Sequence, residues 1–552
     1  MQTSAGAGLA EPDPAPSLGP GIARGAALIA GLTIVSRLFG LVRTLVFSQT
    51  VGATCLGTAY VTANQVPNLL YELVLGGALT SAMVPVLARS AERAAHDPAD
   101  RARVSQITSA LLTWSVIILV PTTLGIAAVA GPIASLLNPA NPSAHCARPE
   151  MVADTATMLE VFAPQALLYG LSVVLYGLLQ AYRRFAAPTI GPAISSLVLI
   201  SCYLAFVPLD KGLPLARLPL SAELVLAAGT TLGIAALVLV AVLPTWRLGL
   251  RLRPAVRFPP GVARRAGGLA LVGLAELIII DLSSIVAIVL ANGRGQTGAI
   301  VIFGYASQVF SSVSAVLALS IVTSTFPVLS AREGPVFNRT CAGSTRAALL
   351  MSWLATAVLA AVAISAAHVL AKQPDQVPEL IEAFVMFAPG VAGITVIANL
   401  SRVMFVLGRL KIAAAGLAGS WLLVIVADLV LAELAPPRLV VAALALGNTI
   451  GQTVVAIPMV RVTRRICGPA AVQGVSRAAL AGLAAGAAGT AVGVAVSLAG
   501  PVTGKLSAFA LAVPAALGAV LAFGLVAYLL DPRDLRTILA LARRTASRAR
   551  NA

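Results

Sequence analysis

The stretch SRLFGLVRTLVFSQTVG, residues 36–52, places two arginines inside an apolar segment that begins near residue 22. Arg37 lies about fifteen residues into this segment, and Arg43 follows six residues later. A guanidinium at the centre of a bilayer costs about 2.5–3.5 kcal/mol on insertion scales. Two charges at this depth therefore indicate a polar bundle interior or a water-filled cavity rather than contact with lipid.

The composition of the whole chain is that of a membrane protein. Of its 552 residues, 58% are hydrophobic and only 11% are charged, and the mean hydropathy is +0.93. Soluble domains contain about 25% charged residues. Counting apolar runs of about 20 residues, we predict an all-α polytopic membrane protein with about 14 transmembrane helices. The predicted spans are 22–46, 58–88, 104–137, 151–182, 186–208, 221–246, 264–292, 297–331, 342–372, 379–407, 410–434, 438–463, 475–499 and 506–531.

The net charge of +17 follows the predicted membrane topology. When alternate loops are assigned to opposite sides, 27 Lys and Arg residues fall on one side and seven on the other. The seven are Arg148, Lys211, Arg217, Arg294, Lys372, Arg438 and Lys505. The positive-inside rule places the side with 27, together with both termini, in the cytoplasm. We therefore expect a multi-pass plasma-membrane protein and no nucleic-acid partner.

The two halves of the chain carry an internal repeat. A shift of 242 residues aligns GAALIAGL (25–32) with GGLALVGL (267–274), and a shift of 225 aligns FAP (162–164) with FAP (387–389). Each unit contains six predicted helices, so both enter the membrane from the same side and form a parallel repeat. We predict two six-helix lobes around a central cavity, followed by two further helices.

This repeat divides the chain into six parts. They are a disordered cytoplasmic tail (1–21), an N-lobe (22–246), a basic cytoplasmic linker (247–263), a C-lobe (264–463), the last two helices (464–531) and a basic cytoplasmic tail (532–552). The last part suits either a solvated tail or a helix lying on anionic headgroups. The five cysteines show no metal-binding spacing. Cys55 and Cys146 both fall in outside-facing loops and could pair, but unpaired thiols are the favoured expectation.

Few ionisable residues lie well inside the predicted spans. They are Arg37, Arg43, Glu72, Glu160, Glu276, Asp281, Arg402 and Asp428. Arg37 and Glu72 lie about 22 and 21 Å along their helices, near the midplane, where they can pair. Gly40 is expected to loosen the helix so that both arginines turn toward one cavity. One interpretation of Arg37 and Arg43 is a buried pair that locks the packing of the lobes. The favoured interpretation is that both arginines line the cavity and contact an anionic headgroup, because guanidinium and phosphate form strong hydrogen bonds.

Several longer motifs resemble the MurJ (MviN) family of lipid II flippases, part of the multidrug/oligosaccharidyl-lipid/polysaccharide exporter superfamily. They are SRLFGLVR (36–43), NQVPNLLYELVLGGALTSAMVPVLA (64–88), GLLQAYRRFAAPTIGPAI (177–194), YASQVFSSVSAVLALSIVTSTFPVLS (305–330) and FVLGRLKIA (405–413). The Leu-Tyr-Glu version of the second motif is similar to the high-GC Gram-positive branch. The resemblance implies movement of undecaprenyl-diphosphate-linked peptidoglycan precursor from the inner to the outer leaflet by alternating access.

The resemblance also implies a set of substrate-binding residues. Ser36, Arg37 and Arg43 match family positions that line the cavity for a diphosphate headgroup, and Gln308 stands where many members have a cavity arginine. The full candidate set is Ser36, Arg37, Arg43, Asn68, Glu72, Gln308 and Arg402. The chain departs from the family at Thr44 and Thr58, where acidic residues are frequent, and at Tyr71 and Glu72, where basic residues are frequent. These departures leave the identity of the lipid-linked glycan open.

No nucleotide-binding motif such as G-x-x-x-x-G-K-[ST] is evident. We therefore expect a transporter rather than an enzyme, without a cofactor, and driven by a proton, a monovalent cation, the membrane potential or consumption of the product. Some relatives hold a cation in the C-lobe, and the candidate acids here are Glu276, Asp281 and Asp428. Structural carboxyls without an ion are an equal alternative.

Three functions remain open from the sequence. The first is a flippase for lipid II, or for another polyprenyl-linked glycan. The second is a multidrug antiporter of the same superfamily, and the third is a non-transporting scaffold in a cell-wall synthesis complex. The expected partners are a polyprenyl-diphosphate-linked saccharide, membrane lipids and cell-wall synthesis proteins.

Overall fold

The computed structural model describes residues 20–73, 87, 91–94, 97–210, 215–258, 262–500, 502, 504–536 and 538. Within these residues the secondary structure is helical and contains no strand. The predicted tail 1–21 lies outside the described residues except for its last two positions. The predicted basic tail 532–552 is described only over 532–536 and at 538.

The N-terminal half, residues 20–258, contains eight α-helices and a short 3-10 turn in its described part. These are α1 (Pro20–Thr50), α2 (Cys55–Glu72), α4 (Pro98–Ala128), α5 (Ala130–Leu137), α6 (Arg148–Phe162), α7 (Gln165–Ala181), α8 (Ala186–Asp210), η2 (Leu215–Arg217) and α9 (Leu220–Trp246).

The C-terminal half, from residue 262 onward, is also helical where it is described. Its elements are α10 (Val262–Arg294), α11 (Ala299–Val313), the π-helical η3 (Ser314–Leu319), α12 (Ser320–Ser330), α13 (Gly334–Leu370), α14 (Gln376–Phe387), α15 (Gly390–Val406), α16 (Leu410–Leu434), η4 (Pro437–Leu439), α17 (Val440–Cys467), η5 (Pro469–Val472), α18 (Val475–Leu498) and α19 (Lys505–Leu530).

The described residues contain 13 helices long and apolar enough to cross a membrane, which confirms the all-α membrane architecture. Each of them overlaps a predicted span. α2 is not among the 13, and the span predicted at 58–88 continues into residues 74–86, which lie outside the described residues. The predicted count of about 14 is therefore not confirmed.

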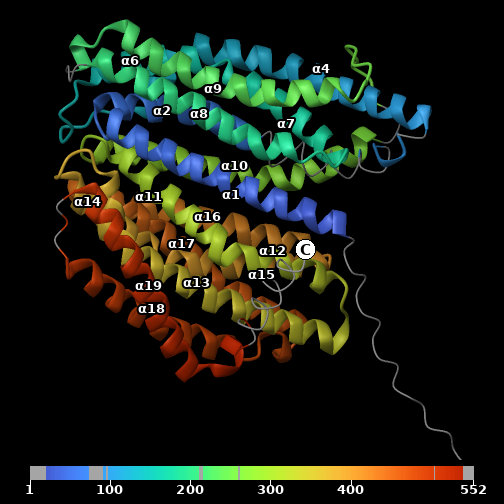
Figure 1. Ribbon diagram of the computed structural model, residues 1–552, viewed down its shortest axis with the longest axis vertical. Helices are drawn as coiled ribbons and strands as arrows, with labels where there is room; N and C mark the ends of the chain where they lie inside the picture. Colours follow the sequence, from blue (N-terminus) through green and yellow to red (C-terminus); the bar gives the residue numbers. More distant parts are fainter. Residues whose placement is uncertain are drawn as a thin grey trace, which may run out of the picture.

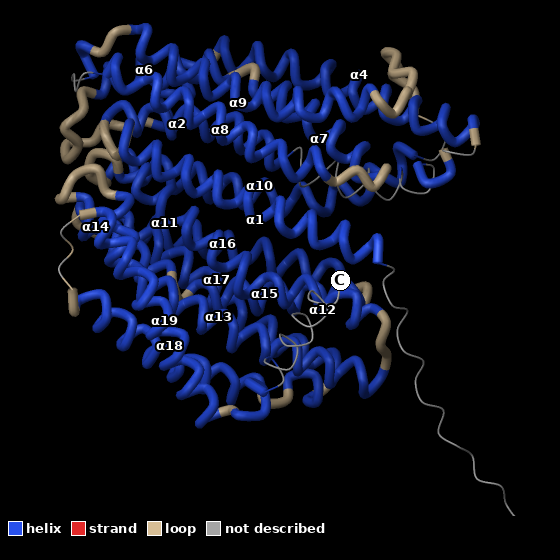
Figure 2. Tube along the Cα trace, in the orientation of Figure 1, coloured by secondary structure: helices blue, strands red, loops and turns tan. Residues whose placement is uncertain are grey.

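The helices run side by side, with the two halves of the chain on opposite sides of the bundle (Figure 1). α1 packs chiefly on α8, α10 packs on α16, and α18 and α19 pack on α13. Loops collect at the two ends of the helices (Figure 2). We call one the basic end, because it carries Arg183, Arg184, Arg409 and the linker 247–258. The other is the disulfide end, which carries residues 51–54, 138–147, 295–298 and 371–375.

The two halves repeat local geometry where the sequence motifs align. Both FAP motifs stand at a break between two helices, α6 and α7 in one half and α14 and α15 in the other. Twenty-one residues after the Phe of each motif, the chain takes a left-handed turn, at Arg183 (φ 57°) and at Gly408 (φ 70°). The next amide donates back to a carbonyl five residues earlier, at 2.8 Å in both cases. The helix break and the left-handed turn recur in both halves at the same shift of 225 residues, which supports the predicted duplication.

The last two helices are fastened to the C-terminal half at the basic end. Arg346 of α13 donates to the carboxylate of Asp534 at 2.8 Å, and Arg477 of α18 donates to Asp531 at 2.9 Å. Asp531 is buried, so this pairing neutralises a carboxylate removed from water. The chain segment just after α19 is therefore anchored through acidic residues.

Candidate functional site

A cavity of about 560 Å³ lies between helices of the N-terminal half and α11. Its polar wall residues are Arg43, Thr44, Asn64, Gln65, Asn68, Glu72, Thr230 and Gln308, together with Tyr60, Tyr71, Tyr169, Tyr203 and Tyr305. A pocket in the range of a few hundred Å³ with convergent polar groups is the usual form of a ligand site. We call it the central cavity.

The helix α1 supplies the charge in the central cavity. Arg43 and Phe47, four residues apart and so on one helix face, both line the wall. Arg37 is exposed and lies outside this lining, because six residues in a straight helix turn the side chain by about 120°. The expected loosening at Gly40 is not observed, since the helix continues without interruption from Pro20 to Thr50. Ser36 is half-buried and also lies outside the lining.

Three other sequence-predicted residues lie in the cavity wall. The amide oxygen of Asn68 accepts a hydrogen bond from the hydroxyl of Tyr169 at 2.9 Å. Glu72 and Gln308 are both exposed to the cavity. No ion pair joins Arg37 to Glu72 among the described residues, so the expected midplane pair is not formed in this state.

Sequence reasoning missed several wall residues. Asn64 and Gln65 stand one turn before Asn68, and two amides in an apolar segment are a signal that could have identified them. The tyrosines carry no such signal, because aromatic residues occur throughout membrane helices. Their position on four different helices is a tertiary property.

An aromatic cluster closes the central cavity toward the disulfide end. Phe47 packs on Tyr60 with ring centroids 5.1 Å apart and on Tyr203 at 5.3 Å. The hydroxyl of Tyr60 hydrogen-bonds to those of Tyr203, at 2.9 Å, and Thr230, at 2.8 Å. Tyr305 of the other half meets Phe47 edge-on at 6.4 Å. These side chains are buried, so they separate the cavity from the loops beyond them.

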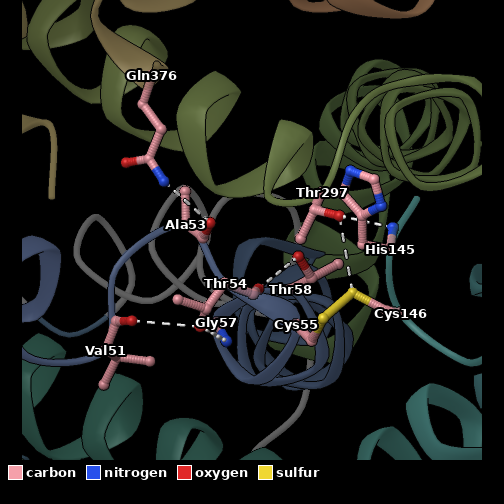
Figure 3. Close-up of a disulfide and its surroundings, with 10 residues drawn as sticks. All are labelled: Val51, Ala53, Thr54, Cys55, Gly57, Thr58, His145, Cys146, Thr297 and Gln376. Carbon is pink, nitrogen blue, oxygen red and sulfur yellow. Dashed lines mark hydrogen bonds between the residues drawn. A yellow bond between two sulfur atoms is a disulfide. The ribbon is translucent and has the colours of Figure 1, made fainter. Parts of the chain in front are cut away.

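The hydrogen bonds that join the two halves gather at the disulfide end. Gln376 of α14 donates to the carbonyl of Ala53 at 3.2 Å, and the hydroxyl of Thr297 accepts from the amide of His145 at 3.0 Å (Figure 3). The side-chain amide of Asn292 donates to Thr62 at 2.9 Å. We call these contacts, with those of Lys372 described next, the seal.

Lys372 reaches across the seal to the end of α1. Its ammonium donates to the carbonyl of Thr50 at 2.5 Å and to that of Val51 at 3.4 Å. Cations are favoured at a helix C-terminus, and α1 has no basic residue in its own last turn. Burial lowers the pKa of Lys372, and the carboxylate of Asp210 opposes this shift. Because Lys372 is still partly exposed, its contribution is that of a surface charge, about 0–1 kcal/mol.

A disulfide joins Cys55 at the start of α2 to Cys146 in the loop before α6 (Figure 3). The expectation of unpaired thiols was therefore wrong. The two cysteines are 91 residues apart in sequence, and only the packing of α2 on α6 brings them together. The bond holds both N-terminal loops that face the seal, and the hydroxyl of Thr297 lies 3.8 Å from Sγ of Cys146.

The candidate cation ligands do not form one cluster in the described residues. Asp281 and Asp428 are both buried, at 5% and 2% exposure, and neither is hydrogen-bonded to the other. Asp281 interacts electrostatically with Glu72. Asp428 instead packs against α17, where a Cβ at Gly447 would collide with its carboxylate. The side chain of Glu276 lies outside the described residues. Arg402 of α15 has a buried nitrogen without a partner and lies outside the cavity lining.

Comparison with known sequences identifies one family. The family profile described as "Lipid II flippase MurJ" matches residues 47–506. The "Probable lipid II flippase MurJ" of Synechocystis sp. is 30% identical over 242 residues, 43% of each chain. The "Lipid II flippase MurJ" of Burkholderia cenocepacia is 28% identical over 180 residues, 33% of each chain. These matches therefore span less than half the length of the curated relatives.

Comparison with solved structures shows a shared fold. A structure described as "Lipid II flippase MurJ, inward closed conformation" aligns with a TM-score of 0.69 at 15% identity, covering 91% of this chain and 99% of that one. An inward-facing multidrug resistance MATE family transporter of the MOP superfamily aligns with a TM-score of 0.61 at 13% identity, covering 81% and 98%.

We predict that Cys55→Ser, Cys146→Ser and the double variant lower the melting temperature of the purified protein by the same amount. Loss of either cysteine breaks one and the same cross-link, which acts by restricting the unfolded chain. Thermal unfolding in detergent checks this, with Cys467→Ser as a control because that thiol is free. Additive losses in the double variant would show that the two cysteines act separately.

We predict that Lys372→Ala loosens the seal. The reporter is Asn64→Cys in a background without the three free cysteines, labelled in intact cells with a membrane-impermeant maleimide. Labelling should become faster by up to about fivefold, as expected for the loss of about 1 kcal/mol. Arg438→Ala is the matched control, since it removes an exposed cation at the same end outside the seal. Equal labelling in both variants would contradict a sealing role.

Proposed function

The chain belongs to the lipid II flippase MurJ family, and from that membership we propose that it moves lipid II across the bacterial cytoplasmic membrane. Lipid II is a polyprenyl-diphosphate-linked saccharide, so its transport supplies peptidoglycan precursor for cell-wall synthesis. The observation that carries the proposal is a central cavity with a guanidinium in its wall and a seal that, among the described residues, closes the disulfide end.

The wall of the central cavity suits the chemistry of such a headgroup. Arg43 supplies a planar cation with several donors, which favours a diphosphate. Asn64, Gln65, Asn68 and Gln308 supply amides that both donate and accept, as sugar hydroxyls require. We propose that Arg43 contacts the diphosphate and that Arg37, one and a half turns nearer the basic end, receives it first.

We propose that the basic end faces the cytoplasm, with both termini on that side. The positive-inside rule supports this orientation. The disulfide supports it independently, because disulfides persist on the oxidising side of the membrane. In this orientation the described state is closed to the outside, and α1 exposes Arg37 and Leu38 near the side from which the precursor would enter.

We propose that transport is coupled to a proton or a monovalent cation through a carboxylate in the C-terminal half. Asp428 is the leading candidate, because it is buried and one of its oxygens has no hydrogen-bond partner. Asp281 is a separate candidate, which is buried outside the lining of the central cavity and feels the like charge of Glu72. Enzymes that consume the precursor on the outer side are the proposed protein partners.

The proposed function is tested by depleting the protein and measuring lipid-linked intermediates on each leaflet. Accumulation of lipid II on the inner leaflet, with loss from the outer one, is the expected result. Accumulation of a different polyprenyl-linked glycan would reassign the cargo within the same class. Normal export of every lipid-linked glycan would overturn the proposal and favour a scaffold or a multidrug transporter.

We predict that Arg43→Ala fails to complement a depleted strain, whereas Arg43→Lys retains part of the function. Lysine keeps the charge but loses the planar fork that matches phosphate oxygens. Arg37→Ala is expected to fail as well if Arg37 receives the headgroup. Growth and precursor export are compared at matched membrane abundance, with Arg438→Ala as the control. Normal export in the Arg43→Ala strain would make this arginine a packing residue.

We predict that Asp428→Asn slows transport and removes its dependence on the coupling ion. The amide has nearly the shape of the carboxylate but cannot ionise. The measurement is the rate of precursor export while the proton and sodium gradients are dissipated separately. Asp281→Asn is the paired variant, and loss of the ion dependence there instead of in Asp428→Asn would assign the coupling to Asp281. Unchanged ion dependence in Asp428→Asn would leave its carboxylate a structural role only.

A further inference from the structure

The linker between the two halves runs along the basic end of α4, to which its backbone is hydrogen-bonded. Six hydrogen bonds between α4 side chains and linker backbone hold it over residues 248–256. They run from Arg101 to the carbonyls of Leu248 and Gly249, from Ser105 to that of Arg251, from the amides of Arg253 and Ala255 to Ser109 and Thr113, and from the indole of Trp114 to the carbonyl of Val256. The predicted basic linker is therefore held against α4 by its own backbone over these residues.

The first turn of the linker depends on a glycine. Gly249 has a φ of +63°, which favours a residue without a Cβ. A Cβ there would also lie only 2.8 Å from a guanidinium nitrogen of Arg101. The turn thus brings the linker backbone into contact with Arg101 and starts its path along α4.

Between the linker and α4 lies a cavity of about 670 Å³ with a cationic wall. Arg101, Arg251 and Arg253 line it, and none of its described wall residues is acidic. Within the described residues none of these three arginines forms an ion pair. Arg183, Arg346 and Arg477 at this end each have a carboxylate partner, whereas Arg103 and Arg247 have none among the described residues; the three arginines of the cavity are distinguished by lining one common cavity. The cavity therefore presents unneutralised positive charge to a ligand.

An apolar cavity of about 340 Å³ continues from the cationic one. The two share Ser109, Arg253 and Pro254. The walls of the second are largely aliphatic, formed by Leu112, Val116, Ile117 and Leu252. Val116 and Ile117 are 42% and 45% exposed, so this wall is open on the outer surface of the bundle.

The length of α4 places the two cavities at different depths. Its 31 residues span about 46 Å, whereas the hydrocarbon core is about 30 Å thick. The polar first third, residues 98–108, thus extends into the headgroup layer and carries the cationic cavity. The apolar cavity, over residues 109–117, lies at the edge of the hydrocarbon.

We propose that this two-part cleft binds an anionic phospholipid of the leaflet at the basic end. Its phosphate lies between Arg101, Arg251 and Arg253, and one acyl chain lies along Val116 and Ile117. A soluble anion would use the cationic cavity alone and would leave the apolar one without a role. The cleft shares no residue with the central cavity, so this site is additional to that of the proposed cargo.

The test uses delipidated full-length protein in detergent and measures bound lipid by native mass spectrometry. The probes are phosphatidylglycerol and phosphatidylcholine with the same acyl chains. The test variant is Arg251→Gln with Arg253→Gln, whose backbone contacts to α4 are kept. The matched control is Arg103→Gln with Arg247→Gln, which removes two exposed arginines of the same end from outside the cleft.

We expect the parent protein to retain phosphatidylglycerol in preference to phosphatidylcholine. The test variant should lose this retention by roughly twenty- to thirtyfold, since each basic residue near an anionic leaflet contributes about fivefold. The control should remain near the parent, and unchanged melting temperatures would show that both variants are folded.

Three results would overturn the proposal. The first is equal retention of the two lipids, and the second is equal loss in the test and control variants. The third is complete displacement of the lipid by millimolar inorganic phosphate or by glycerol phosphate, which would make the cleft a site for a soluble phosphate. Because the readout is binding, failure here leaves the proposed transport function untouched.

Discussion

The carboxyl end of α1 is capped by side chains from the other half of the chain, and this junction closes the disulfide end in the described state. A helix leaves its last carbonyls without partners. Here Lys372 donates to Thr50 and Val51, and Gln376 donates to Ala53 just beyond the helix. The end of α1 also carries Phe47 into the aromatic cluster, four residues after Arg43. The same helix end therefore takes part in closing the disulfide end and in holding Arg43 in the cavity wall.

A seal of this kind is reversible because water can replace each of its bonds. Exposed or partly exposed polar contacts contribute little individually. The disulfide lies to one side of the seal, entirely within the N-terminal half. It therefore keeps the two loops of that half in one arrangement while the contacts across the seal form and break. Rigid halves with a weak junction are what alternating access requires.

The same helical framework is compatible with different cargoes. The fold is shared with multidrug transporters at 13% identity, so it does not identify what is carried. The side chains inside the cavity are more informative. A guanidinium surrounded by amides and tyrosine hydroxyls suits an anionic, hydroxyl-rich headgroup, whereas an organic cation would be repelled by Arg43. The unpaired arginines of the linker cleft are at the surface and serve a different class of ligand.

The sequence by itself determined the helical membrane class and the approximate place of 13 membrane spans, since both depend on properties local to a segment. The breaks at the FAP motifs and the turns at Arg183 and Gly408 were not predicted, since the sequence analysis placed one continuous span across each motif; the structure shows them. Sequence also pointed to Arg43, Asn68, Glu72 and Gln308 as cavity residues, but not to the direction of Arg37.

The tertiary structure alone decided which distant groups meet. Cys55 and Cys146 pair because α2 packs on α6, and no spacing rule relates residues 91 apart. Asp281 and Asp428 were grouped because the resemblance implied a shared cation site, yet one feels the charge of Glu72 and the other lies against Gly447. The linker arginines looked like topology signals until α4 fixed their backbone. In each case the deciding quantity is a distance between helices, which depends on how all the helices pack together rather than on the residues of any one segment.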